Sequence, residues 1–130
     1  MQQSTDHLSQ LTFDSLGLAP TLMQGIVDAK FVQATPIQAQ TLPTALLGRD
    51  IAGQAQTGTG KTAAFLIALY NTLLTKKPER PLPPNAVRAI VLAPTRELAV
   101  QIHSDAVVLA RHTGLNLALC FGGPCAKAGA

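Results

Sequence analysis

The sequence is poor in aromatic and charged residues. Its 130 residues include no tryptophan, one tyrosine and four phenylalanines, and only 13% of them are charged. Soluble domains usually carry about 25% charged residues. Ten basic residues stand against seven acidic ones, so the net charge is only +3. This mild excess permits a polyanionic partner such as RNA or a nucleotide, but it does not demand one.

Cysteines and long apolar runs are also scarce. Cys120 and Cys125 stand five positions apart with no histidine nearby, which does not make a four-ligand zinc site. Because nothing else indicates secretion, we expect both thiols to be reduced. No apolar run approaches the roughly 18 residues of a membrane span, and the polar stretch 1–12 lacks the apolar core of a signal peptide. We therefore expect a cytoplasmic protein without membrane contact, whose residues 1–12 are flexible.

Apolar residues make up 47% of the chain, and their pattern alternates between strand and helix. Two helices come first, over 20–30 and from Thr35 to about Gly48, with Pro43 expected to kink or break the second. The pattern then predicts a strand over 50–54, a helix over 61–75, a strand over 86–93, a helix over 96–112 and a strand over 115–121. The run 86–93 is typical of a strand buried on both faces. This βαβαβ order predicts an α/β fold with a parallel sheet and flanking helices.

A phosphate-binding loop is the most specific signal. The segment Ala55-Gln-Thr-Gly-Thr-Gly-Lys-Thr62 matches the P-loop pattern except that alanine stands at the first glycine position. Its glycines allow backbone N–H groups to face phosphate oxygens, and the next helix adds its positive N-terminal end. Lys61 would contact the β- and γ-phosphates, and the Thr62 hydroxyl would coordinate Mg²⁺. Many reaction classes use such a loop, so the loop alone does not choose among them.

Three further segments occur around this loop. They are Phe31-Val-Gln-Ala-Thr-Pro-Ile-Gln38, Pro94-Thr-Arg-Glu-Leu-Ala99 and Gly122-Gly123. With the phosphate loop, they resemble the Q motif, motif I, motif Ia and the GG motif of DEAD-box ATP-dependent RNA helicases, in the family's order. The resemblance implies a RecA-like P-loop NTPase fold, truncated within its sheet, with a partial helicase ATP-binding domain over residues 13–130.

The resemblance implies ATP and Mg as cofactors. The Gln38 amide both donates and accepts, so it can pair with the adenine edge, and Phe31 offers a flat face for stacking on the base. Lys61 and Thr62 would be the catalytic members of the site, and Thr35 would support the loop. The full ATP-binding set is Phe13, Phe31, Gln38, Gln56, Thr57, Gly58, Thr59, Gly60, Lys61 and Thr62. From the pattern alone, Gln38 could instead be an exposed helix-start residue, and Phe13 could be a core contact.

RNA is the partner that the remaining motifs imply, and no particular protein partner is indicated. Pro94, Thr95 and Arg96 open a helix at the carboxyl edge of the expected sheet, where α/β folds bind ligands. Thr95 and Arg96 can hold RNA phosphates together with backbone N–H groups. Gly122 and Gly123 would allow close approach of backbone to backbone. Binding would then be independent of sequence and sensitive to salt.

The chain departs from the family pattern in a few places. Lys30 stands where the family usually has glycine, and Ala34 where it often has proline. The 130 residues contain no Asp-Glu-Ala-Asp and no Ser-Ala-Thr, so we expect them to bind ATP without turning it over. We also expect unpaired sheet edges. Three hypotheses stay open: a helicase domain, a non-catalytic nucleotide- or RNA-binding fragment, and another P-loop NTPase, which Gln38 and Pro94–Ala99 disfavour.

Overall fold

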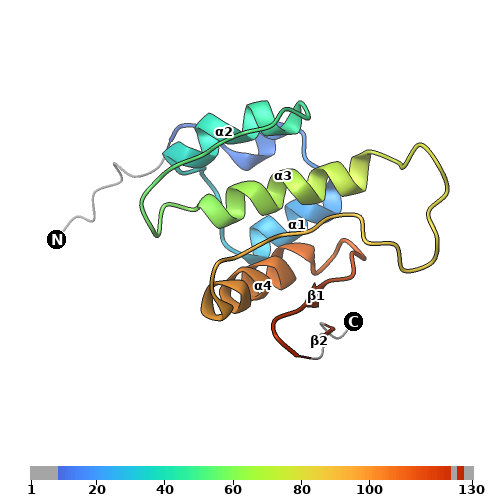
Figure 1. The fold of residues 1–130 in the computed structure, drawn as a ribbon. Coiled ribbons are helices and arrows are strands. Elements are labelled where there is room, and N and C mark those ends of the chain that lie inside the picture. The colour runs from blue at the N-terminus through green and yellow to red at the C-terminus, as the bar shows by residue number, and fades with distance from the viewer. Residues whose placement is uncertain (1–8, 124–125, 128–130) are drawn as a thin grey trace.

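The computed structural model describes residues 9–123 and 126–127. Their elements are the 3₁₀ helix η2 (Phe13–Leu16), helices α1 (Pro20–Asp28), α2 (Pro36–Leu46), α3 (Lys61–Thr75) and α4 (Arg96–Ala110), and strands β1 (Ala118–Leu119) and β2 (Ala126–Lys127). Figure 1 shows α3 in the middle, with α2 on one side and α4 on the other. No helix in the described part of the chain is long and apolar enough to cross a bilayer.

The helices follow the sequence pattern closely. Helix α3 has the bounds predicted for it, and α1 and α4 each end two residues earlier than predicted. Thr35 is the N-cap of α2, and Pro43 lies inside α2 without ending it, so the helix is not broken there. Residues 9–12 fall in the stretch expected to be flexible, and they pair with 33–34 through an isolated bridge and backbone hydrogen bonds.

The expected parallel sheet is not formed among the described residues, and this prediction is wrong in detail. The observed sheet has only β1 and β2, which pair antiparallel with Ala118 opposite Lys127. No backbone hydrogen bond joins 50–54 or 86–93 to a strand within residues 9–123 and 126–127. A strand forms only against a neighbour that accepts its N–H and C=O groups. In the topology that the motifs imply, further strands lie between these two segments, and the described residues supply none.

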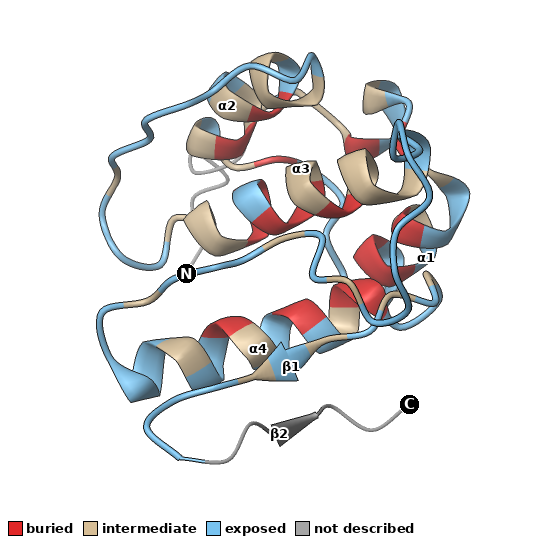
Figure 2. Cartoon of the chain, turned by 45° about the vertical axis from the view of Figure 1, so that its right-hand side comes forward, coloured by how far each residue is buried: buried red, intermediate tan, exposed pale blue. Residues whose placement is uncertain are grey.

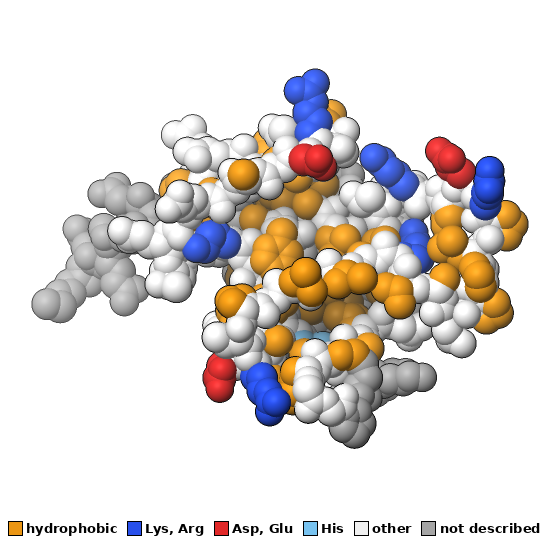
Figure 3. Space-filling model, in the orientation of Figure 1, with side chains coloured by type: hydrophobic (Ala, Val, Ile, Leu, Met, Phe, Trp, Pro, Cys, Tyr) orange, Lys and Arg blue, Asp and Glu red, His pale blue; other side chains and the backbone are white. Residues whose placement is uncertain are grey.

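The segment 86–93 is consequently exposed, although its apolar run predicted a buried strand. Val87 is 77% exposed, Ile90 76% and Leu92 88%. Figure 1 shows 86–93 crossing the near side of the helices, and Figure 3 shows apolar side chains gathered around a hollow on that same face. The single charged side chain in the segment, Arg88, donates to Leu73 O at 2.9 Å.

The core lies between the helices. Figure 2 shows the buried faces of α1, α3 and α4 turned toward one another. The side chains with almost no exposed surface are Phe13, Leu22, Ile26, Leu42, Leu66, Ile67 and Leu109. Gly25 makes the crossing of α1 and α4 possible, because a Cβ at this position would lie 2.2 Å from Leu109 O. Only glycine permits that backbone approach.

Cys120 departs from the sequence-based expectation. It is disulfide-bonded in the structure, so the expectation that its thiol is reduced is wrong. The expectation rested on the absence of any secretion signal, which says nothing about which thiols the fold brings together. Cys125 lies outside the described residues.

Alkaline pH should reveal the contribution of Tyr70. Its hydroxyl donates to Ala106 O at 3.3 Å, and burial raises the pKa of the phenol from 10.0 to about 12. The unfolded chain ionises this phenol at lower pH than the folded chain does, so stability is fully present below pH 10 and is lost as the pH rises toward about 12. Tyr70→Phe should therefore lose less stability over this window than the unaltered chain. Urea unfolding at neutral pH and at about pH 11 measures both losses, and equal losses would contradict the assignment.

Lys30 should carry measurable backbone strain. Its φ of 61° is left-handed, the region that lysine adopts at a cost of roughly 1–2 kcal/mol. Lys30→Gly should raise the free energy of unfolding by about 0.5–1 kcal/mol, because the added chain entropy of glycine offsets part of the relief. Asn85 has a φ of 63° and is the matched control, since asparagine tolerates this region. Urea midpoints should show a smaller gain for Asn85→Gly, and the reverse order would count against strain at Lys30.

Candidate functional site

The phosphate loop enters α3 with its N-terminal N–H groups uncovered. Gly58 and Gly60 adopt left-handed φ values of 80° and 87°, which only glycine adopts without cost. Gly60 is the N-cap of α3, and no side chain caps that end. The first N–H groups of α3 and the positive end of its dipole therefore face the loop. Within the loop, Thr59 Oγ1 donates to Gln56 O at 2.7 Å, and the Lys61 ammonium donates to Ala55 O.

The start of α2 holds this loop through two side chains. Thr35 Oγ1 donates to Thr59 O at 2.7 Å, and Gln38 Nε2 donates to Gly60 O at 3.1 Å. Gln38 Oε1 in turn accepts from Thr35 N at 2.9 Å, so the two side chains and the loop form one network. The Q-motif and phosphate-loop residues therefore lie together, although 22 positions separate Gln38 from Gly60.

Gln38 is buried. It is 3% exposed, which rules out the alternative of an exposed helix-start residue. A Cβ at Gly60 would come 2.4 Å from Gln38 Nε2, so the contact depends on glycine at that position. Thr35 supports the loop as the sequence motif implies. Its hydroxyl donates to one loop carbonyl, and the Gln38 amide donates to the next.

Two phenylalanines stack beside α1, at different depths. The ring centroids of Phe13 and Phe31 lie 6.2 Å apart with 30° between the planes. Phe31 is 37% exposed, whereas Phe13 is 1% exposed. Phe13 thus lies in the core behind Phe31, as the core-contact alternative describes, and the structure does not bring it to the surface. The turn before Phe31 places Lys30 at its left-handed φ of 61°, the conformation that the glycine usual in the family adopts readily.

The segments predicted to bind RNA meet at the N-terminus of α4. Thr95 is the N-cap, and its hydroxyl accepts from Leu98 N at 3.2 Å. The Arg96 guanidinium lies 5.5 Å from the centroid of the Phe121 ring. A Cβ at Gly122 would lie 2.8 Å from Nη2 of Arg96. Pro94, Thr95, Arg96, Gly122 and Gly123 are all exposed, and Gly122 and Gly123 have φ values of 22° and 147°.

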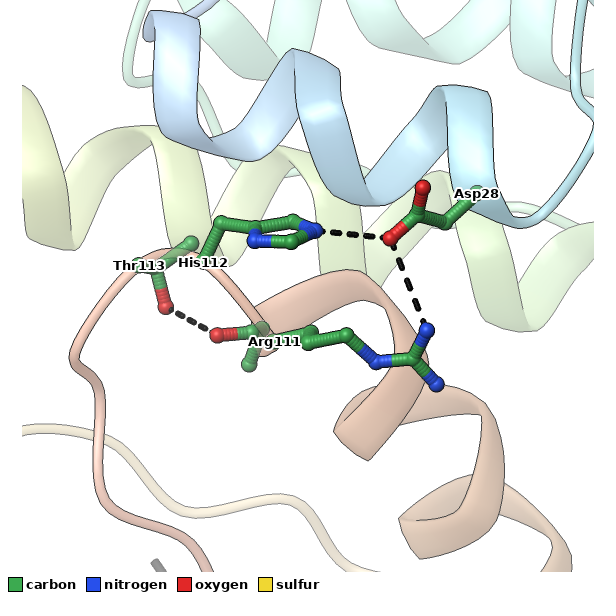
Figure 4. A network of polar contacts seen from close by, with 5 residues as sticks. Asp28, Arg111, His112 and Thr113 are labelled. Carbon is green, nitrogen blue, oxygen red and sulfur yellow. Dashed lines mark hydrogen bonds and ion pairs between the residues drawn. The ribbon is translucent and has the colours of Figure 1, made fainter.

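Sequence reasoning missed one polar cluster. His112 Nε2 lies 2.7 Å from Asp28 Oδ2, and Arg111 Nη1 lies 3.5 Å from the same oxygen. Figure 4 shows both side chains reaching Asp28 from the end of α4. His112 is exposed, and no local sequence pattern marks Asp28 as its partner. The Nε2 of His103 is buried without a hydrogen-bond partner among the described residues. No group of three or more metal-ligating side chains occurs among them.

Comparisons with known proteins agree with these motifs. The family model described as "DEAD/DEAH box helicase" matches residues 35–128. The chain is 55% identical over 116 residues to the ATP-dependent RNA helicase RhlB of Xanthomonas campestris pv. campestris (strain B100), which is 89% of this chain and 20% of that protein. It is 52% identical over 120 residues to RhlB of Sodalis glossinidius, which is 92% of this chain and 29% of that protein. The chain thus spans about a fifth to three tenths of these relatives.

Solved structures give the same fold class. Prp28, an RNA helicase from Chaetomium thermophilum solved with ADP, matches with a TM-score of 0.73 and 35% identity, over 90% of this chain and 28% of Prp28. S. cerevisiae Dbp5, solved with Gle1 and IP6, matches with a TM-score of 0.69 and 35% identity, over 85% of this chain and 27% of Dbp5. The RecA-like α/β class is thereby confirmed, as a helix-rich part of that fold. With its motifs in order and most of its length matched by the family model, the chain belongs to the DEAD/DEAH box helicase family.

Proposed function

We propose that residues 13–130 are the ATP- and RNA-binding first part of the RecA-like domain of a cytoplasmic ATP-dependent RNA helicase. The observation that carries the proposal is the pair of bonds from Thr35 and Gln38 to the carbonyls of Thr59 and Gly60. These bonds join the start of α2, which is suited to recognising a base, to the phosphate loop, which is suited to holding phosphates. The RhlB relatives are named ATP-dependent RNA helicases, which supports the same function.

The adenine base would be recognised beside α2. The Gln38 amide uses one hydrogen and one lone pair inside the protein, so its second hydrogen and second lone pair stay available. One donor and one acceptor side by side fit the edge of adenine, as glutamine does in reading that base elsewhere. Phe31 would stack on the base with its exposed face, and Phe13 would support Phe31 from the core side. Prp28, which was solved with ADP, agrees with an adenine nucleotide here.

The phosphates would lie over the loop residues Gln56 to Gly60 and the start of α3. Bare N–H groups at a helix N-terminus favour an anion, and the left-handed glycines aim further N–H groups toward it. Lys61 would exchange Ala55 O for the β- and γ-phosphate oxygens. The Thr62 hydroxyl would coordinate Mg²⁺, which supplies charge neutralisation at the phosphates when bound. These residues fit a nucleotide's phosphates. The lysine, the hydroxyls and the backbone N–H groups are all donors, and the loop 55–60 holds no acidic side chain that would repel an anion.

RNA would bind at the N-terminus of α4. Thr95, Arg96 and the two glycines are exposed there, and the one cation among them faces solvent beside Phe121. Contacts of this kind hold phosphates and do not read bases.

A non-catalytic nucleotide-binding role describes the 130 residues taken by themselves, because they contain no Asp-Glu-Ala-Asp to position Mg²⁺ and water. We therefore expect binding of ATP by these residues without turnover.

Nucleotide binding tests the proposal directly. Titration of a fluorescent ADP analogue should saturate. Lys61→Ala should weaken the affinity at least about tenfold, because a hydrogen bond to a charged phosphate contributes roughly 1.5–3 kcal/mol. Gln38→Ala should weaken it roughly threefold to tenfold, because a hydrogen bond to the neutral adenine base contributes about 0.5–1.5 kcal/mol. Gln40→Ala is the matched control, since Gln40 is an exposed glutamine on the same helix. Its affinity should match that of the unaltered chain. Equal affinities for all four proteins, or no saturable binding, would contradict the proposed site.

RNA binding should depend on Arg96 through its charge. Arg96→Ala should weaken binding of single-stranded RNA equally for different sequences and should lower the slope of log K against log salt by about 0.7. Arg80→Ala removes the same charge from the exposed loop before residue 86 and should leave the slope nearly unchanged. The slope is measured by fluorescence anisotropy at several salt concentrations. A similar change in both variants would mean that only net charge matters and that α4 makes no particular contact.

A further inference from the structure

The end of α1 leads directly into the proposed base-stacking ring. After Asp28, the chain turns through Ala29 and Lys30 and reaches Phe31 in three residues. Backbone hydrogen bonds hold this turn to α1 itself, from Lys30 N to Val27 O at 2.8 Å and from Phe31 N to Ile26 O at 3.1 Å. The position of Phe31 therefore follows the position of the last turn of α1.

The last turn of α1 is held by the end of α4. Gly25 lies against the backbone of Leu109, and one turn further on Asp28 Oδ2 lies 2.7 Å from His112 Nε2 and 3.5 Å from Arg111 Nη1. In Figure 4 the two cationic or polar groups converge on this one carboxylate oxygen. Gly25 allows the two helices to approach closely, and Asp28 joins the last turn of α1 to the residues that follow α4. We call Asp28, Arg111 and His112 the α1–α4 clasp.

The clasp lies at the surface of the molecule. Its side chains are 35% exposed at Asp28, 56% at Arg111 and 37% at His112, and ion pairs this exposed contribute little to the stability of a fold. The three residues have no role in the phosphate loop or at the N-terminus of α4. Through the turn at Lys30, the clasp adjoins the segment that ends at Phe31. At the other end of the same helix lie Thr95 and Arg96, so α4 also connects the base-stacking ring with the proposed RNA contacts.

We propose that the clasp positions the adenine-base subsite, with Asp28 as the positioning residue. Arg111 and His112 hold Asp28, Asp28 sets the end of α1, and the end of α1 sets the face that Phe31 presents to the base. Asp28 does not touch the nucleotide. This inference rests on the proposed function, since it assigns a determinant of base recognition to the same site. Asp28 is the last residue of α1, and its partners Arg111 and His112 follow the end of α4, the helix that begins with motif Ia.

The test separates the base from the phosphates. Affinities for fluorescent ADP and GDP analogues and for base-free tripolyphosphate are measured with the unaltered chain, Asp28→Ala and Asp28→Asn. Asp28→Ala should bind the ADP analogue up to about fivefold more weakly, because exposed ion pairs can hold Phe31 in place no more strongly than the pairs themselves interact. It should also prefer adenine over guanine less, and bind tripolyphosphate as before. Asp28→Asn should restore most of the adenine preference, because its amide oxygen still accepts from Arg111 and His112.

Two further variants keep the outcome decisive. Asp105→Ala removes an exposed carboxylate from α4 and should change none of the three affinities. The double variant Arg111→Ala with His112→Ala removes the donors, and it should reproduce the loss of adenine preference even if Asp28→Ala does not fold. Unchanged base preference in the variants, or equal losses for ADP and tripolyphosphate, would overturn the clasp as a positioning device. Failure of the unaltered chain to bind the ADP analogue would instead overturn the proposed function, and this inference with it.

Discussion

The bonds from α2 to the phosphate loop are the interaction on which the site depends. A glycine-rich loop has many accessible conformations, and each glycine loses more chain entropy on ordering than other residues do. Thr35 and Gln38 reduce that freedom by occupying two consecutive loop carbonyls, at Thr59 and Gly60. Gln38 is 3% exposed and belongs to a helix whose Leu42 is fully buried. The shape of the loop is thus tied to packing in the helical core.

A second constraint is the pairing of backbone N–H and C=O groups. It explains why the helices form whereas the expected parallel sheet does not. A helix satisfies its N–H and C=O groups within itself, and so α3 and α4 form and pack against α1 without outside partners. A strand has no such option. The segment 86–93 therefore stays extended and exposed, with Leu92 at 88% exposure. An uncovered apolar segment of this kind has backbone N–H and C=O groups open to pairing with another polypeptide.

Features that depend on local sequence could be predicted, and features that depend on distant contacts could not. The bounds of α3 follow from the glycines before it and the apolar run within it, and the support that Thr35 gives to the loop followed from the resemblance of 31–38 to the Q motif. The Asp28–His112 contact joins residues 84 positions apart, and no local pattern marks either one. The depth of Phe13 and the buried Nε2 of His103 depend likewise on which helices pack together. The sheet was mispredicted because an apolar run reports the capacity to pair and says nothing about whether partners are at hand.

Binding of base-free tripolyphosphate to the unaltered chain, Gln38→Ala and Thr35→Val tests the central claim most directly, because this ligand cannot contact a base-reading group. If α2 holds the loop in its phosphate-binding shape, both variants should bind tripolyphosphate more weakly than the unaltered chain, while Gln40→Ala should bind it equally well. The account would be contradicted if both variants kept full affinity for tripolyphosphate. In that case Gln38 would act on the base alone, and the phosphate loop would hold its shape without α2.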